Sequence, residues 1–470
     1  MIKFGTDGWR GIIADDFTIA NVKLVTQAIV NYLKSAGLAA KGLVIGYDNR
    51  FFSERFAREA ARVAAGNQIK VWLTESSAPS PAVSFAVKSK TAAGAIMITA
   101  SHNPPQWNGL KFKTRESGSA PLEVTQEIER QIQLKPEPAE TYPEELIVKF
   151  NPKIDYFSHL ETLVDLPKIA DAKIKVVVDP MHGSSAGYLH DLLAFYGLEV
   201  IEINNTRDPL FGGINPEPLP GNLEELTSLT KEITLKDQFK SLCVGLALDG
   251  DGDRLGAVDS KGSYINPHQI FAILLKHLVE YRKLKGNVVK TFNITELINK
   301  MVKTYDLKLN ETPIGFKYIC DLMLKADILI GGEESGGIGI KGHIPERDGI
   351  LAGLLLLEAM AVNKKSLGEL MDDLNKKYGP YFYNRSDLRL PEEKKKIFME
   401  KLKASPPAML AKLKVSRRED LDGQKFYLED GSWILFRPSG TEPLLRIYAE
   451  GGTEERVDLL LAEGEKLATS

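Results

Sequence analysis

Apolar runs of strand length alternate with longer helical patterns along most of the chain. The strand-like runs are residues 42–48, 69–73, 94–100, 173–180, 198–204, 243–249, 287–293 and 326–332. The helical patterns lie at 54–65, 185–196, 267–283, 294–304 and after Arg347. Strands that alternate with helices predict α/β units around largely parallel or mixed sheets.

The pattern changes in the last 90 or so residues, where strand-like pieces around "SWILFRPSG" and "LLRIYAE" precede the helical "EERVDLLLAEGEKLA". A chain of 470 residues is too long for one core. We therefore predict three related α/β domains with mixed sheets and a smaller C-terminal α+β domain. The expected domains are residues 1–148, 149–258, 259–378 and 379–470. The proline- and glutamate-rich stretch 134–145 is expected to be a linker or an exposed crossover.

The net charge, the length of the apolar runs and the cysteine spacing exclude several classes of protein. Because the net charge is only −3, nothing in the overall charge favours nucleic acid or an anionic membrane as a partner. The longest apolar run, residues 350–362, is too short to span a bilayer and predicts a buried helix. The N-terminus lacks a secretory signal, and Cys243 and Cys320 lack metal or redox spacing, so we expect a mature cytoplasmic protein with reduced, buried thiols.

The stretch "TASHNPPQWNGLKFK", residues 99–113, follows an apolar run and is polar and broken by prolines. We expect its side chains to be presented rather than buried. Ser101 lies just past the end of a predicted strand, where open α/β sheets bind ligands, although a serine that caps a turn is an equal alternative. A serine hydrolase is disfavoured, because the stretch forms neither a GxSxG nor an SxxK motif.

The second candidate is "LALDGDGDRLG", residues 246–256, in which Asp249, Asp251 and Asp253 alternate with glycines after an apolar strand. A tight turn can direct three carboxylates to one point, and such hard oxygen ligands suit Mg²⁺. An EF-hand is excluded because Arg254 and Ser260 stand where glycine and glutamate are required. A solvated acidic turn remains the alternative.

Two further loops carry candidate ligands. The glycine-rich loop 331–349 offers Glu333 and Ser335, whose carboxylate and hydroxyl can bind vicinal sugar hydroxyls, unless it is a surface loop with incidental charges. The loop 436–446, "FRPSGTEPLLR", combines arginines, hydroxyls and a glycine, as a phosphate clamp requires. A surface turn with an arginine is its alternative.

These four motifs, together with "FGTDGWRG" near the N-terminus, resemble those of the α-D-phosphohexomutase family, and the resemblance covers essentially the whole chain. The resemblance implies four domains around one central cleft, the fourth of them mobile. It also implies that Ser101 is the phosphorylated serine, and that Asp249, Asp251 and Asp253 hold Mg²⁺ together with a phosphoserine oxygen.

The other site residues follow from the same resemblance. Arg10 and Lys111 would lie beside the phosphoserine and the attacking oxygen, and His102 would shape the loop. Residues expected to bind the substrate, with Glu333 and Ser335 on its sugar hydroxyls, are Arg254, Gly315, Glu333, Ser335, His343 and Arg347. Residues expected to hold the phosphate that is not reacting are Arg437, Ser439, Gly440, Thr441 and Arg446.

The implied reaction interconverts glucose 1-phosphate and glucose 6-phosphate, with glucose 1,6-bisphosphate as intermediate and activator. Glucose is favoured because "GHIPERDGI" and "TPIGFKYI" resemble glucose-specific members, and because the 333–337 loop lacks the histidine usual in other branches. Mannose and glucosamine phosphates remain alternatives. A haloacid-dehalogenase-type, Mg²⁺-dependent phosphatase with Asp249 as nucleophile would leave Ser101 unused. A silent sugar-phosphate-binding protein would be expected to lose Ser101 or an aspartate, and none is missing. Monomer and homodimer both stay open.

Overall fold

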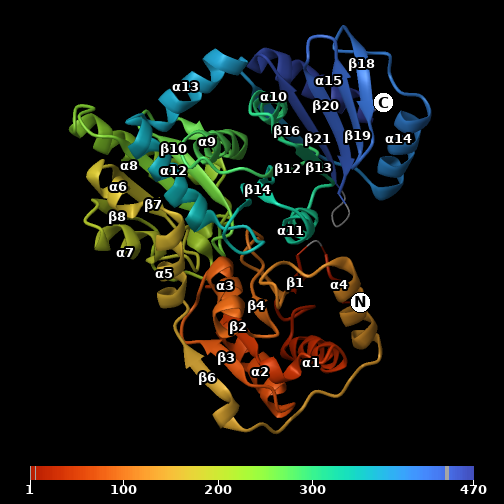
Figure 1. The fold of residues 1–470 in the computed structure, drawn as a ribbon. Coiled ribbons are helices and arrows are strands. Elements are labelled where there is room, and N and C mark those ends of the chain that lie inside the picture. Colours follow the sequence, from red (N-terminus) through yellow and green to blue (C-terminus); the bar gives the residue numbers. More distant parts are fainter. Residues whose placement is uncertain (1, 6, 440–443, 470) are drawn as a thin grey trace. The chain divides into compact units, whose positions relative to one another are not determined.

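A computed structural model describes residues 2–5, 7–439 and 444–469, and Figure 1 labels the elements. The chain divides into two compact units. Unit 1 comprises Met1–Asn287 and Gly315–Leu370, and unit 2 comprises Val288–Ile314 and Met371–Ser470. Among the described helices, none combines the length and the apolar character that a membrane span requires.

The first sheet of unit 1 has six strands in the order β1-β5-β4-β2-β3-β6, of which β2, β3, β4 and β6 are parallel. Strands β1 and β5 join it antiparallel at one edge. Its strands are β1 Trp9–Ile12, β2 Leu43–Tyr47, β3 Val71–Thr74, β4 Gly94–Ile98, β5 Trp107–Thr114 and β6 Ile147–Phe150. Its helices are α1 Ile19–Ser35, α2 Ser53–Gly66, α3 Ser80–Lys90 and α4 Leu122–Gln133.

Both faces of this sheet are buried. In β2, Ile45 packs into a core with residues of α1, α2 and α4, while Val44 packs into a separate core with residues of α3. Since neither face of the central strands β2 and β4 meets water, these strands are continuously apolar rather than alternating. The stretch 134–145 leads from α4 to β6, which pairs with β3, so it is a crossover within the first sheet's domain.

The second sheet of unit 1 has the order β11-β10-β9-β7-β8, with β7, β8 and β9 parallel and β10 and β11 antiparallel. Its strands are β7 Lys175–Asp179, β8 Val200–Glu202, β9 Cys243–Leu248, β10 Leu255–Asp259 and β11 Tyr264–Ile265. The helices of this region are α5 Lys153–Leu163, α6 Leu166–Asp171, α7 Tyr188–Phe195 and α8 Glu224–Lys236. The two sheets end at Phe150 and Ile265, slightly beyond the predicted limits of their domains.

The third α/β region is also mixed, because β12 and β13 pair in parallel in unit 2 and β14 and β15 pair antiparallel in unit 1. Its strands are β12 Asn287–Thr291, β13 Leu309–Thr312, β14 Ile328–Gly332 and β15 Ile338–Ile340. Its helices are α9 Pro267–Glu280, α10 Glu296–Thr304, α11 Phe316–Lys325, α12 Gly349–Asn363 and α13 Leu367–Tyr378. Helix α12 is buried over almost its whole length, which confirms the helix predicted from residues 350–362.

The C-terminal part of unit 2 is an antiparallel sheet in the order β16-β21-β20-β19-β18-β17 (Figure 1). Helices α14 Glu392–Ala404 and α15 Glu454–Thr469 share one core with this sheet. Its strands are β16 Phe382–Arg389, β17 Met409–Leu410, β18 Leu413–Glu419, β19 Gln424–Leu428, β20 Trp433–Pro438 and β21 Leu444–Gly451. Three mixed α/β regions and a C-terminal α+β domain confirm the predicted fold class, whereas the shared cleft stays a prediction.

Candidate active site

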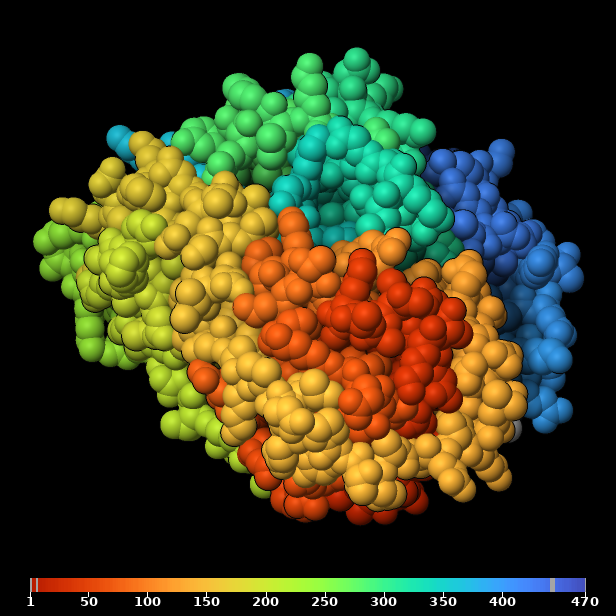
Figure 2. Space-filling model, turned by 60° about the horizontal axis from the view of Figure 1, so that its bottom comes forward, coloured from red at the N-terminus to blue at the C-terminus, as the bar shows by residue number. Residues whose placement is uncertain are grey.

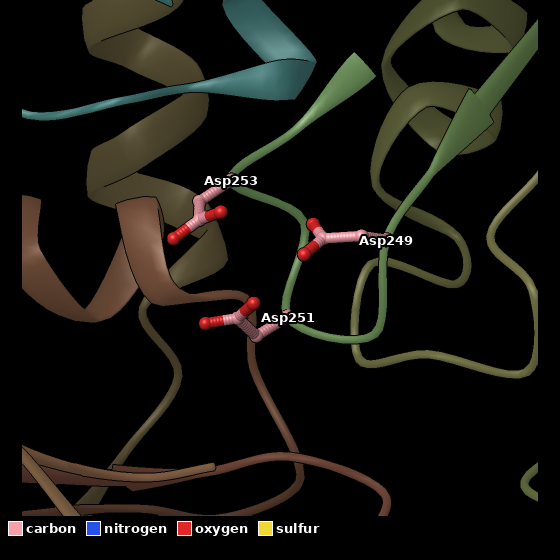
Figure 3. A group of neighbouring side chains, drawn as sticks. All are labelled: Asp249, Asp251 and Asp253. Atoms are coloured by element: carbon pink, nitrogen blue, oxygen red, sulfur yellow. The ribbon is translucent and has the colours of Figure 1, made fainter. Parts of the chain in front are cut away.

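The acidic loop, residues 249–253, follows directly from the buried strand β9. Asp249, Asp251 and Asp253 are at most 1% exposed, and Figure 3 shows their carboxylates gathered around one point. Each offers an oxygen that lies within 4.8 Å of the other two. Gly252 has a φ of +73° and no space for a β-carbon beside Pro79, so it permits the tight turn that brings the three together.

The three aspartates differ in their electrostatic surroundings. Burial, together with repulsion from Asp253 and Asp251, raises the pKa of Asp249 well above its usual range. Burial also acts to raise the pKa of Asp251, but the charge and hydrogen bond of Lys111 Nζ, 2.8 Å from Asp251 Oδ2, hold that pKa below the usual value. Asp253 Oδ2 lies 3.1 Å from the same Nζ and 2.8 Å from Nη2 of Arg347.

The donor set fits a hard divalent cation. In the part of the chain that the structure describes, the buried oxygens Asp251 Oδ1 and Asp253 Oδ1 have no hydrogen-bond partner. Buried carboxylate oxygens without partners are costly unless a cation neutralises them. The three aspartates therefore suit Mg²⁺, which prefers oxygen ligands.

Ser101 lies between β4 and β5 and contacts the acidic loop. Its hydroxyl donates to Asp249 Oδ2 at 2.8 Å, and its backbone has a φ of +54°, which is unusual outside glycine. The expectation of a presented side chain is wrong, because Ser101 and Lys111 are each 1% exposed. The polar groups of this stretch can be buried because carboxylates pair with them.

His102 is the next residue in the loop that carries Ser101, and Arg10 contacts that loop. His102 Nδ1 is 3.5 Å from Ser101 Oγ, and burial together with nearby positive charges, Arg254 foremost, holds the pKa of His102 well below its usual range. The imidazole is therefore neutral at neutral pH. Arg10 extends from β1 and donates through Nη1 to Asn103 Oδ1 at 2.5 Å.

The loop after β14 also lies near the acidic loop, because its Glu333 contacts Arg347, which binds Asp253. The Glu333 carboxylate lies 3.3 Å from Arg347 Nη1, and the backbone bond from Gly336 N to Glu333 O closes the turn that contains Ser335. Arg254 directly follows the acidic loop. Its backbone N donates to Asp249 Oδ1 at 3.0 Å, and its Nη1 donates to Glu217 Oε1 at 3.0 Å.

Gly315 precedes α11 with a φ of +136°, and the ring of the next residue, Phe316, lies 5.4 Å from the Arg347 guanidinium. The structure thus brings together around the acidic loop most of the residues predicted for unit 1: Ser101, Arg10, His102, Lys111, Arg254, Glu333 and Arg347, with the turn of Ser335 beside them.

His343 lies in a different cluster. Its fully buried ring stacks near Phe85, its Nδ1 is 3.0 Å from His159 Nε2, and its Nε2 is 2.9 Å from Asp348 Oδ2. Tyr156 donates to the same Asp348 oxygen at 2.6 Å. A substrate-binding role for His343 stays a prediction.

A buried charge network that the sequence analysis did not identify supports the site. Asp7 Oδ2 lies 2.8 Å from Lys111 Nζ and 2.6 Å from Arg347 Nη2, and its Oδ1 lies 3.0 Å from Lys113 Nζ. Lys113 Nζ also donates to Glu346 Oε2 at 2.6 Å. Figure 2 shows the N-terminal residues, red and orange, beside the turquoise segment that carries Glu346.

The sequence carried only a partial signal for this network, because the acids that pair with the lysines are distant in the chain. Lys111 and Lys113 are two residues apart in an apolar run, so in a strand they share a face, and two buried lysines require buried acids.

The predicted phosphate clamp lies in unit 2 at the end of the β20–β21 hairpin. Arg437 and Arg446 stand opposite each other across the two strands. Arg437 Nε donates to Asp422 Oδ2 at 3.0 Å, and Arg446 Nε lies 3.9 Å from Asp387 Oδ1. Ser439 is buried, with its backbone N bonded to Leu444 O. Gly440 and Thr441 lie outside the described residues.

Directly opposed like charges are unfavourable unless anions compensate them. Here Asp422 lies beside Arg437 and Asp387 beside Arg446, so phosphate binding at the end of the hairpin stays a prediction.

Comparisons with known proteins cover the whole chain. Phosphoglucomutase/phosphomannomutase alpha/beta/alpha domains I, II and III match residues 1–138, 154–262 and 266–378, and the C-terminal domain of the same family matches residues 388–466.

Individual relatives agree with these matches. A phosphoglucosamine mutase of Carboxydothermus hydrogenoformans is 31% identical, with 99% of each chain covered. A phosphoglucomutase of Komagataeibacter xylinus is 27% identical over 96% of this chain and 87% of its own length. The crystal structure of a Thermus thermophilus protein, provisionally described as a phosphomannomutase, superposes with a TM-score of 0.87 at 35% identity, covering 100% of this chain and 99% of the other. The chain therefore belongs to the α-D-phosphohexomutase family, the phosphoglucomutases and phosphomannomutases, whose members are intramolecular phosphotransferases.

Proposed function

We propose that this phosphohexomutase interconverts glucose 1-phosphate and glucose 6-phosphate, and that Ser101 carries the transferred phosphoryl group. The observation that carries the proposal is the 2.8 Å hydrogen bond from Ser101 Oγ to Asp249, inside a buried group of three carboxylates. A serine hydroxyl at that place can lose or accept a phosphoryl group beside a bound cation.

Phosphoryl transfer chiefly requires positioning and charge neutralisation. Asp249, Asp251 and Asp253 would hold Mg²⁺, which when bound would neutralise charge on the phosphoryl oxygens. Lys111 adds a permanent positive charge, since despite its burial the neighbouring aspartates raise its pKa above the usual value. In each half-reaction the bond between phosphorus and Ser101 Oγ breaks while a bond to a sugar hydroxyl oxygen forms, or the reverse. Burial of Ser101 limits loss of the phosphate to water.

The remaining residues would bind the sugar and its second phosphate. Glu333 and Ser335 would bind sugar hydroxyls, and Arg254, Gly315 and Arg347 would contact the substrate beside them. Arg437, Ser439, Gly440, Thr441 and Arg446 would hold the phosphate that is not reacting. Glucose 1,6-bisphosphate would then be the intermediate, and it would act as activator by phosphorylating Ser101.

Glucose is preferred on the basis of the sugar loop. Its sequence, Glu-Glu-Ser-Gly-Gly from Glu333, lacks the histidine expected of the mannose and glucosamine branches. The "PERDG" segment resembles glucose-specific members, in which the basic residue serves the substrate, and its Arg347 lies 2.8 Å from Asp253. The K. xylinus relative is named phosphoglucomutase, although the C. hydrogenoformans relative is named phosphoglucosamine mutase.

The test is a comparison of kcat/KM for the 1-phosphates of glucose, mannose and glucosamine, with Mg²⁺ and a trace of the matching 1,6-bisphosphate. We expect the highest value for glucose 1-phosphate, the mass of one added phosphate on the wild type, and neither activity nor added phosphate on S101A. A higher value for glucosamine 1-phosphate would overturn the glucose preference. Full activity of S101A, or release of inorganic phosphate in place of isomerisation, would overturn the role of Ser101.

A further inference from the structure

We propose that Arg50 is a positioning residue for phosphoryl transfer, because it holds the backbone of the loop that carries Ser101; the inference rests on the proposed role of Ser101. Arg50 follows β2 and is fully buried. Its Nη2 donates to the carbonyl oxygens of Ser101 at 2.6 Å and Asn103 at 2.7 Å. Its Nη1 donates to those of Pro104 at 2.9 Å and Trp107 at 3.0 Å. One guanidinium thus binds three carbonyls of the loop between β4 and β5 and that of Trp107, the first residue of β5.

A second contact fixes Ser101 from its other side. The Ser101 backbone N donates to Thr99 Oγ1 at 2.9 Å, and the Thr99 hydroxyl donates to Asp48 Oδ2 at 2.6 Å. The same Asp48 oxygen lies 3.1 Å from Arg50 Nε. Asp48 therefore compensates the buried charge of Arg50 and anchors Thr99, so that the peptide groups on both sides of the Ser101 α-carbon are held by one buried ion pair.

The conformation of Ser101 explains why such a device is needed. A φ of +54° is disfavoured for a serine and persists only where the surroundings impose it. In this conformation the Ser101 hydroxyl reaches Asp249. If the loop relaxed, the hydroxyl would leave the carboxylates, and a misplacement of about 1 Å can slow transfer by about 100-fold.

The planar guanidinium group of arginine, with several N–H donors, is essential to this arrangement. A lysine at position 50 would keep the charge and much of the volume, but a single ammonium group cannot reach carbonyls spread over residues 101–107. We therefore expect R50K to fold, to be phosphorylated slowly and to transfer phosphate slowly.

The experiment uses the full chain with Mg²⁺ and glucose 1,6-bisphosphate. It compares wild type, R50K, T99V, T99S and, as a matched control, R282K, which alters an arginine that donates to Leu163 O and Glu358 away from the acidic loop. The readouts are Tm, KM, kcat, and the ratio of phosphoserine hydrolysis to transfer onto glucose 6-phosphate in a single turnover.

We expect R50K and T99V to lose about 10- to 100-fold in kcat with little change in KM, and to hydrolyse a larger share of the phosphoserine. T99S, which keeps the hydroxyl, should recover most of the rate. R282K should lower Tm without this change in the hydrolysis ratio.

Wild-type transfer and hydrolysis in folded R50K would overturn the inference. The same conclusion would follow if R50K failed to fold while T99V behaved as wild type. If the wild type itself accepts no phosphate, the proposed function fails and this inference fails with it, which distinguishes the two cases.

Discussion

At the scale of single residues, the acidic loop shows how a neighbour decides the state of a carboxylate. Asp251 and Asp249 are both fully buried, but Lys111 lies beside only the first. The pKa of Asp251 is therefore lowered, whereas burial and two negative neighbours raise that of Asp249. Ionised Asp249 is unfavourable without a cation beside it, so the carboxylate that accepts the hydrogen bond of Ser101 lowers the stability of the metal-free protein.

D249N should therefore have opposite effects on stability and on activity. Without metal, the amide should relieve the repulsion and increase the free energy of unfolding by roughly 1–2 kcal/mol, while mutase activity falls at least about 100-fold. Thermal unfolding in EDTA and assays in Mg²⁺ measure the two quantities. A D249N protein that is less stable than wild type in EDTA would contradict the prediction.

At the scale of elements, the β20–β21 hairpin presents Arg437 and Arg446 side by side. R437A should lower kcat/KM by about 10- to 100-fold for glucose 1-phosphate and glucose 6-phosphate alike, because a charged contact to a shared phosphate contributes roughly 1.5–3 kcal/mol. Tm should hardly change. R417A, which removes an exposed arginine of β18 in the same sheet, is the control. A defect limited to one substrate would show that the hairpin does not serve both orientations.

The face of the sheet that carries Arg437 and Arg446 also holds a buried lysine, Lys425. Lys425 Nζ lies 4.1 Å from the centre of the Trp433 ring and donates to Phe292 O at 2.9 Å. Burial, reinforced by the charge of Lys290, lowers the pKa of Lys425 from 10.5 to about 8. Since the unfolded chain then binds more protons between these values, stability rises with pH from about 8 to about 10.5, and the cost of the buried charge is fully present below about 8.

We therefore expect the wild type to gain stability relative to K425M as pH rises through that window, by up to about 3 kcal/mol. Thermal unfolding of both proteins across this pH range measures the difference. Parallel pH profiles for the two proteins would rule out a neutral Lys425.

At the scale of the whole molecule, long-range ion pairs join segments far apart in the chain. Lys113 of β5 binds Asp7 and Glu346, and Arg347 binds Asp7 and Asp253, so four sequence regions of unit 1 meet in one buried network. Removing one member leaves its partners charged and buried, which is more costly than removing a pair.

K113M should thus reduce the free energy of unfolding by about 3–5 kcal/mol, and K113M/E346Q should be more stable than the sum of the single changes predicts. Chemical unfolding of the four proteins measures this coupling. K236M, which removes an exposed ion pair with Glu232 on α8, should change little. Additive effects of K113M and E346Q would contradict a shared network.

The same long-range character limits what the sequence could reveal. The buried strands β4 and β9 and the polar residues that follow them were predictable, because an apolar run and its end are local features. Lys113 and Glu346 were not, since 233 residues separate the partners. Strand β5 was missed for a related reason: its two lysines look solvent-exposed until their acids are known. The domain limits near 148 and 258 fell within β6 and β10, where no change of composition marks the ends of the sheets.

Helix α12 begins at the acidic loop, where Gly349 N donates to Gly252 O at 3.2 Å. The aligned peptide dipoles of a helix place about half a positive charge at its first turn. A bound metal ion or phosphate group would exchange during the proposed turnover, whereas this partial charge belongs to the backbone. A constant contribution of the backbone therefore favours the carboxylates through every step of the cycle, and side-chain substitutions within α12 leave it in place as long as the helix forms.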